Sequence, residues 1–222
     1  MNKSHNVFES NSVFRQFEEY VHRQIIALKP EEIQIFSEDL VLENYSIIIR
    51  PDKELLSIIE KHIAELRIID PKQFYYPLEQ LHLTILGNIA ISVDESKLVA
   101  IIEQIKKQYN FEFLLKGFGS NMHTASIFAY PQFALHDLRE QLRKELNVSG
   151  DYTNPFFKGF EYTGWINFIR YKQIPSLKLI EKLRNIMAEE IGIMKSTQIE
   201  LYRSSSKTFN PEHAKLLQSF NL

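Results

Sequence analysis

His82 and Thr84 are the residues of this chain whose types and spacing most clearly suggest chemistry. They stand two positions apart in LHLTIL at 81–86, a run typical of a β-strand, so both side chains should point to one face of the strand. An imidazole can act as a general acid or base near neutral pH, and a threonine hydroxyl can donate to a phosphate oxygen without adding charge. Taken alone, the spacing favours a structural histidine on a half-buried strand, so the surrounding residues decide the interpretation.

An internal repeat places this strand in a larger pattern. Residues 46–66 align without a gap to 126–146, and each copy is followed by a short apolar strand, LHLTIL at 81–86 and GWINFI at 164–169. The identical positions pair Ser46, Ile47, Pro51, Leu55, Glu60, Glu65 and Leu66 with Ser126, Ile127, Pro131, Leu135, Glu140, Glu145 and Leu146. A duplicated fold usually meets itself across a pseudo-twofold axis. We therefore expect strands 82–87 and 165–170 to be neighbours that face one groove.

The periodicity of apolar residues predicts alternating strands and helices. Each half of the repeat has the order β-α-β-α-β, because the segment 82–117 also corresponds to 165–203. We divide the chain into an N-terminal helical extension at 1–44, a duplicated domain with intertwined lobes at 45–205, and a C-terminal tail with a short helix at 206–222. The expected helices are 11–28, 52–67, 94–109, 132–147, 176–191 and 211–219, and the expected strands are 45–50, 82–89, 111–117, 124–130, 165–171 and 197–203, with a turn at 117–120.

The composition excludes several classes of function. The formal charge of −2 argues against a broad binding surface for duplex DNA or RNA. The chain has no cysteine, which excludes disulfides, iron–sulfur clusters and thiolate zinc sites. The N-terminus lacks the apolar core of a signal peptide, and no apolar run reaches about 18 residues, so we expect a cytoplasmic, soluble protein without a membrane partner.

The stretch YPLEQLHLTILGNI at 76–89 resembles the first signature of the two-histidine (2H) phosphoesterase superfamily, which includes the bacterial RNA 2′,3′-cyclic phosphodiesterases also called 2′-5′ RNA ligases. In that signature a Pro-x-x-x-Leu-His-x-Thr-Leu strand leads into a glycine, and the matching residues here are Pro77, Leu81, His82, Thr84 and Gly87. The resemblance extends over most of 45–205, including FEFLLKGFGS at 111–120 and IELYRSSS at 199–206. It implies an α+β fold of two pseudo-symmetric lobes, with mainly antiparallel sheets lining a central groove and helices outside.

One half of the groove matches the family's catalytic motif, and the other half departs from it. In the family one histidine is the general base and the other the general acid on a 2′,3′-cyclic or 2′,5′ phosphodiester, while Thr or Ser hydroxyls hold phosphate oxygens. The resemblance therefore implies that His82 is a general acid or base and that Thr84 binds phosphate oxygens. Trp165 occupies the position of the second histidine and Asn167 that of its Thr or Ser, while Arg170 falls where the motif carries its arginine. An indole N–H only donates, so Trp165 cannot carry the proton.

We expect Asn167, Arg170, Trp165 and Tyr202 to bind substrate, the aromatic residues by stacking a nucleobase, for which Tyr171 is a further candidate. His123, Glu161 and Tyr162 could stand in for the missing histidine, although the repeat places His123 opposite 43–46 rather than opposite His82. We expect no metal site and no cofactor, because no pair of histidines and carboxylates has a convincing metal-ligand spacing in the sequence.

Three functions remain open at this stage. The first is a hydrolase, a cyclic phosphodiesterase that uses His82 with a nonstandard partner on a small nucleotide or RNA terminus. The second is a noncatalytic descendant that binds a nucleotide or phosphorylated metabolite, and the third is a protein-interaction module with Trp165 buried and helix 11–28 as its active surface. The first is our working hypothesis, because one half-site is complete and Arg170 is kept. We expect a monomer.

Overall fold

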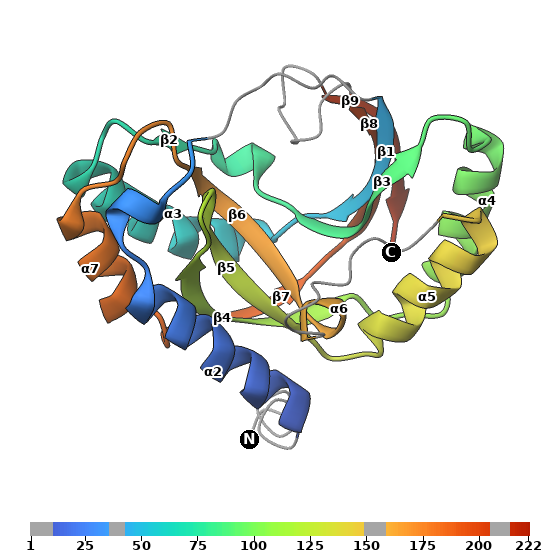
Figure 1. Ribbon diagram of the computed structural model, residues 1–222. Helices are drawn as coiled ribbons and strands as arrows, with labels where there is room; N and C mark the ends of the chain where they lie inside the picture. The colour runs from blue at the N-terminus through green and yellow to red at the C-terminus, as the bar shows by residue number, and fades with distance from the viewer. Residues whose placement is uncertain (1–10, 36–42, 149–158, 205–213) are drawn as a thin grey trace.

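The computed structural model describes residues 11–35, 43–148, 159–204 and 214–222. Within these ranges the strands form one antiparallel sheet with helices on its outer sides (Figure 1). The helices are α2 (Ser12–Ala27), α3 (Lys53–Ile69), α4 (Glu95–Ile105), α5 (Leu135–Leu146), α6 (Gly159–Tyr162) and α7 (Leu177–Asn185), with 3₁₀ turns at Pro30–Glu32 and Leu78–Gln80. The strands are β1 (Asn44–Ile49), β2 (Phe74–Tyr75), β3 (Leu83–Ala90), β4 (Glu112–Ser120), β5 (Thr124–Pro131), β6 (Gly164–Arg170), β7 (Glu190–Lys195), β8 (Gln198–Ser204) and β9 (Ala214–Asn221).

The strand order shows the duplication directly. It is β7-β4-β5-β6-β3-β1-β8-β9, and the middle junction, between β6 and β3, rests on the pair Leu83 and Ile166. Outward from this junction β6 corresponds to β3, β5 to β1 and β4 to β8, which are the equivalences of the sequence repeat. The order confirms that the two motif strands are neighbours. It also shows that each half of the chain places its last repeat strand, β4 or β8, in the lobe built on the other half.

The helices follow the same exchange. α3 packs against β7 and α7, whereas α5 packs against β3 and α4, so each helix covers the lobe opposite its preceding strand (Figure 1). α3 begins where the Asp52 carboxylate accepts from the backbone N–H of Leu55, and it buries an apolar stripe at helical spacing.

The expected helix at 11–28 is α2, which begins at the cap Asn11. Its buried face, formed by Phe14, Phe17 and Val21, packs on β4 and β5 in a cluster that also includes Leu114, Phe128 and Tyr130. Because this apolar face is covered by the sheet of the same molecule, it does not form the exposed docking surface that the interaction-module hypothesis requires.

The prediction of a C-terminal helix at 211–219 is wrong for the residues that the structure describes, since 214–221 is strand β9. β9 extends the sheet along β8, so this segment is part of the domain and not a tail. The register shifts by one residue at Leu217. Because of this bulge, the two side chains that pack against the core, Leu217 and Phe220, are three residues apart. A spacing of three is also typical of the buried face of a helix.

Two further boundaries differ from expectation. α7 ends at Asn185 instead of 191, and the unexpected strand β7 follows it. Gly192, with φ of 144°, has a backbone conformation that a helix cannot contain. The glycine-rich segment at 117–120 is not a turn, since β4 runs to Ser120 with a bulge between Leu115 and Phe118, where Gly117 adopts φ of 87°. No helix among the described residues is long and apolar enough to cross a membrane.

Candidate active site

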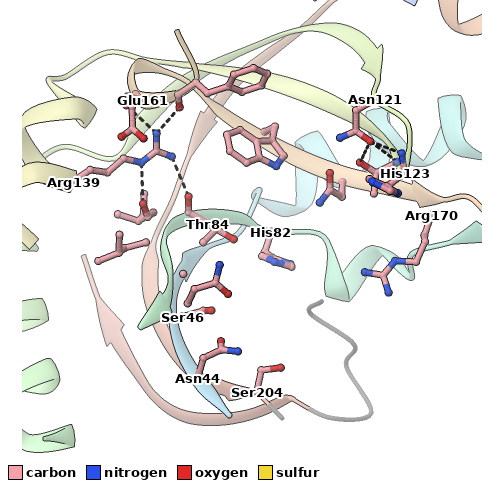
Figure 2. A pocket seen from close by; sticks show the side chains of 18 of the residues that line it. Asn44, Ser46, His82, Thr84, Asn121, His123, Arg139, Glu161, Arg170 and Ser204 are labelled. Atoms are coloured by element: carbon pink, nitrogen blue, oxygen red, sulfur yellow. Dashed lines mark hydrogen bonds between the residues drawn. The ribbon is translucent and has the colours of Figure 1, made fainter. Parts of the chain in front are cut away.

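A pocket of about 330 Å³ lies at the junction of the two lobes (Figure 2). Its lining includes His82 and Thr84 from the first half of the repeat and Trp165, Asn167 and Arg170 from the second. Hydroxyl and amide side chains of β1, β8, the β4–β5 turn and the start of β5 add neutral polar groups to the wall, beside the charged Arg139, Arg143 and Glu161: Asn44, Ser46, Ser204, Asn121 and Thr124. The sheet order thus brings five of the six predicted site residues to one cavity.

His82 is held in one ring orientation. Its Nδ1 lies 2.8 Å from the carbonyl oxygen of Gln80, which can only accept, so Nδ1 carries the proton. In the neutral ring Nε2 is then the acceptor nitrogen. Desolvation by burial lowers the pKa of His82 to about 4, with a smaller contribution in the same direction from the Arg50 charge, while the Gln80 bond opposes the shift. His82 is therefore a neutral imidazole at pH 7, the form that a general base needs.

The segment before His82 is fixed by Arg50, a residue that sequence reasoning missed. Its Nη1 donates to the carbonyl oxygens of Glu79, at 2.6 Å, and Leu81, at 3.3 Å. Nε of the same guanidinium pairs with the Glu200 carboxylate at 2.8 Å, which holds it in place. The carbonyl groups of three consecutive residues before His82 thus accept hydrogen bonds, so the ring position is set by the backbone on its N-terminal side.

Thr84 is positioned from behind by the buried Arg139 of α5, another residue missed from sequence. Arg139 Nη2 donates to the carbonyl oxygen of Thr84 at 3.3 Å and Nε to that of Ile85 at 2.9 Å, while Nη1 reaches three carbonyl oxygens just before β6 (Figure 2). The guanidinium therefore links β3, the first motif strand, to the segment that leads into β6, the second motif strand. The signal was present in the sequence, because Arg139 falls on the helix face that buries Leu135, Leu138 and Leu142.

The second half-site contains donors but no proton carrier. The amide Oδ1 of Asn167 accepts from the Ser126 hydroxyl at 2.6 Å, which leaves the Nδ2 donors as the part of the amide that can serve an anion. Arg170 is buried, and its guanidinium carbon lies 5.8 Å from the centroid of the Tyr76 ring. Trp165 packs edge-on against Phe160 at 5.7 Å and joins the aromatic cluster beneath α2. This half can bind negative charge and apolar surface.

Comparison with known proteins agrees with this geometry at the level of the fold. No protein-family model and no curated protein matches the chain. Solved structures do match: TT0787 of Thermus thermophilus has a TM-score of 0.58 at 17% identity, over 81% of this chain and 97% of that one. A crystal structure of a phosphoesterase (TM-score 0.50, 17% identity) and E. coli LigT complexed with ATP (TM-score 0.50, 15% identity) each align over 81% of this chain and 98% of their own.

The chain has the fold of the two-histidine phosphoesterases. Within this fold the structure locates the remaining sequence candidates. Tyr202 does not line the pocket: its hydroxyl accepts from Arg50 Nη2 at 2.9 Å, so its place gives no support to the predicted stacking on substrate. Tyr171 is fully buried with its hydroxyl 2.6 Å from the Ser120 hydroxyl, and the stacking predicted for it is wrong.

The three residues proposed as substitutes for the second histidine lie in different places relative to this pocket. Glu161 lines it, but its carboxylate accepts from Arg143 at 2.7 Å in a mutually buried ion pair. Tyr162 does not line it and stacks on the ring of His136, with centroids 4.5 Å apart. His123 does line it, from the turn between β4 and β5.

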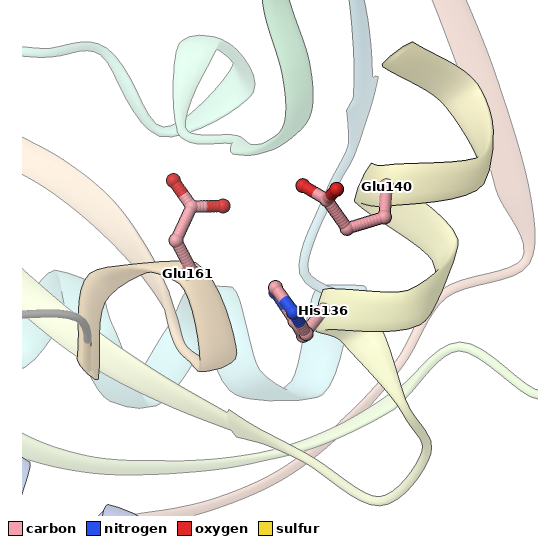
Figure 3. A group of neighbouring side chains, drawn as sticks. All are labelled: His136, Glu140 and Glu161. Atoms are coloured by element: carbon pink, nitrogen blue, oxygen red, sulfur yellow. The ribbon is translucent and has the colours of Figure 1, made fainter. Parts of the chain in front are cut away.

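One cluster among the described residues has a spacing that could suit a metal ion. The ligand atoms of His136, Glu140 and Glu161 lie within 4.8 Å of one another (Figure 3). Arg143 donates to both carboxylates, at 2.6 Å to Glu140 and 2.7 Å to Glu161, so a guanidinium already supplies the positive charge between them. The cluster is therefore better explained as an ion-pair network on the pocket wall than as a metal site.

Proposed function

We propose that this chain is a phosphoesterase that acts on the 2′,3′-cyclic or 2′,5′ phosphodiester of a small nucleotide or RNA terminus. His82 is its general base, Thr84 donates to a phosphate oxygen, and Asn167 and Arg170 bind the anion from the other lobe. The observation that carries this proposal is the state of His82: a neutral ring that lines a pocket, with Nδ1 bonded to Gln80 and Nε2 as its basic nitrogen.

The proposed reaction on a cyclic phosphate begins when water attacks phosphorus and His82 Nε2 takes a proton from that water. One P–O bond of the five-membered ring then breaks, and the departing ribose oxygen takes up a proton. The product is a ribose phosphomonoester, with the water oxygen on phosphorus. Arg170, Asn167 and Thr84 stabilise the negative charge that builds on the phosphoryl oxygens, in the way that donors set in place before the reaction do in other phosphoryl-transfer sites.

The size and lining of the pocket support a small ligand. A volume of about 330 Å³ is at the lower end of the range for small-molecule sites, which suits one nucleotide better than a duplex. The neutral hydroxyl and amide groups on the wall match the donors and acceptors of a ribose and a base. The crystal structure of E. coli LigT, which has the same fold, is a complex with ATP and supports the choice of a nucleotide.

The test is an assay of the purified full-length chain on nucleoside 2′,3′-cyclic phosphates and 2′,5′-linked dinucleotides, with 3′,5′-linked dinucleotides as the comparison substrate. His82→Ala should lower kcat/KM by about 10²- to 10⁴-fold, the usual contribution of one acid–base group. The matched control is His62→Ala, which removes a histidine of α3 that does not line the pocket. Activity that persists in His82→Ala would contradict the proposal, and tight nucleotide binding without any turnover would support the noncatalytic alternative.

A further inference from the structure

The pocket has a base on one lobe and needs a proton donor on the other. In an in-line displacement at phosphorus the attacking and leaving oxygens lie on opposite sides, so the acid should come from the lobe that faces His82. Trp165 occupies the equivalent position of the repeat there and cannot carry a proton. Among the described residues of that lobe that line the pocket, His123 has an imidazole.

His123 is fixed by its own turn. The side-chain oxygen of Asn121 accepts from the backbone N–H groups of His123 and Thr124, both at 2.7 Å, and from the Thr124 hydroxyl at 3.2 Å. The carbonyl oxygen of His123 accepts from the N–H of Tyr171, at the end of the strand that carries Arg170. These bonds hold the residue on the pocket rim beside the arginine that we assign to the anion (Figure 2).

The ring of His123 is oriented by the N-terminal extension. Nδ1 lies 3.2 Å from the carbonyl oxygen of Gln34, and the N–H of Gln34 donates to the carbonyl oxygen of Met122 at 2.8 Å. A carbonyl oxygen accepts only, so Nδ1 keeps its proton and Nε2 is the nitrogen that exchanges one. His82 is oriented in the same way by Gln80, so both pocket histidines exchange protons through Nε2.

We propose that His123 is the general acid of this site and replaces the histidine lost at Trp165; this rests on the phosphoesterase function proposed above. As the ring P–O bond breaks, the Nε2–H of protonated His123 gives its proton to the departing ribose oxygen while His82 takes one from water. The two histidines then exchange protons with solvent, and the net reaction is addition of one water to the cyclic phosphodiester.

The test compares leaving groups in the full-length chain. The substrates are a nucleoside 2′,3′-cyclic phosphate, whose ribose oxygen needs a proton to depart, and the 4-nitrophenyl ester of the same nucleotide, whose 4-nitrophenolate does not. His123→Ala and His123→Gln should lower kcat on the cyclic phosphate by about 10²- to 10⁴-fold and on the nitrophenyl ester by less than about tenfold. His82→Ala should reduce both. Added imidazole should partly restore His123→Ala.

The matched control is Met122→Ala, which changes an exposed neighbour in the same turn that does not line the pocket, and it should keep both activities. Equal losses on both substrates in the two His123 variants would show a structural role and overturn the assignment. If those variants kept full activity while His82→Ala lost it, the role of His123 as general acid would be refuted and the phosphoesterase function would stand. A wild-type chain that turns over neither substrate would refute the phosphoesterase function and His123 together.

Discussion

The two half-sites of the pocket derive from equivalent strands and hold different kinds of side chain. The first presents His82 and Thr84, and its backbone is fixed by arginine side chains on both sides of the motif. The second presents Trp165 and Asn167, and its aromatic residue packs into the cluster beneath α2. Under the proposed function, equivalent positions in the fold would serve proton transfer in the first half-site and aromatic packing with anion binding in the second.

The helices of the repeat differ in the same way. Ile59 and Ile63 of α3 occupy the positions that Arg139 and Arg143 occupy in α5, and all four side chains are buried. The isoleucines fill an apolar interface, whereas the arginines bind backbone carbonyls and Glu161 beside the pocket. The comparison shows that this pair of buried arginines occurs on the repeat helix of one half only, and each prediction below tests one part of the difference between the halves.

The largest effect is expected from Arg139→Leu, which gives α5 an apolar side chain like the one that α3 has at this position. Five carbonyl oxygens would lose their donor in a buried place, and each unsatisfied group costs about 1–3 kcal/mol before relaxation. We expect the free energy of unfolding to fall by roughly 3 kcal/mol or more, measured by urea denaturation. Lys144→Leu, at an exposed position of the same helix, should change it by less than about 0.5 kcal/mol.

The second prediction concerns the pH dependence of stability. An unfolded histidine takes up a proton as the pH falls through about 6.5, whereas burial holds the pKa of folded His82 at about 4. Between these values the unfolded state binds more protons, so wild-type stability should fall by up to roughly 3 kcal/mol more than that of His82→Gln as the pH drops from 7 to 4. Trp165→Phe, at the equivalent position, should keep the wild-type slope. Parallel curves for wild type and His82→Gln would contradict the assigned state of His82.

The third prediction restores symmetry to the pocket. In a His123→Ala background, Trp165→His combined with Asn167→Thr would return a titrating group and a hydroxyl to the second half-site. We expect kcat/KM on a 2′,3′-cyclic phosphate to rise by about 10- to 100-fold, below the full value of an acid–base group because the smaller ring leaves a cavity. Trp165→Phe with Asn167→Thr in the same background, which lacks the imidazole, should show no gain.

The smallest effect is expected at Thr84. Thr84→Val keeps the shape of the side chain and removes one hydrogen bond to a phosphate oxygen, worth about 1 kcal/mol. The Kd of a nucleoside 2′-monophosphate, measured by calorimetry, should rise by about fivefold. Ser219→Ala, at an exposed position of β9 that does not line the pocket, should leave the Kd unchanged. An unchanged Kd in Thr84→Val would remove Thr84 from the anion site.

The strand pattern and the repeat were sufficient to predict the strand pairing at the centre of the molecule and the location of His82, Thr84, Trp165 and Asn167, while the family resemblance indicated Arg170. They succeeded because alternation along a strand fixes which side chains share a face, and a duplicated sequence fixes which strands meet. They failed for β7 and β9. Both are edge strands that form by backbone pairing with one neighbour, and a bulge in each pair interrupts the alternation of apolar and polar side chains from which a strand is predicted.

What the sequence by itself determined is the framework: two similar halves, one with an intact histidine and threonine and the other with tryptophan and asparagine in their places. The tertiary structure decided the rest of the site, because those residues meet only through long-range contacts. Arg50 reaches the carbonyl of Glu79, Arg139 reaches those of Thr84 and Thr163, and His123 bonds to the carbonyl of Gln34 far earlier in the chain. No local pattern encodes a bond between a side chain and a distant carbonyl, since every residue except proline offers the same backbone groups and only the fold selects which one is near.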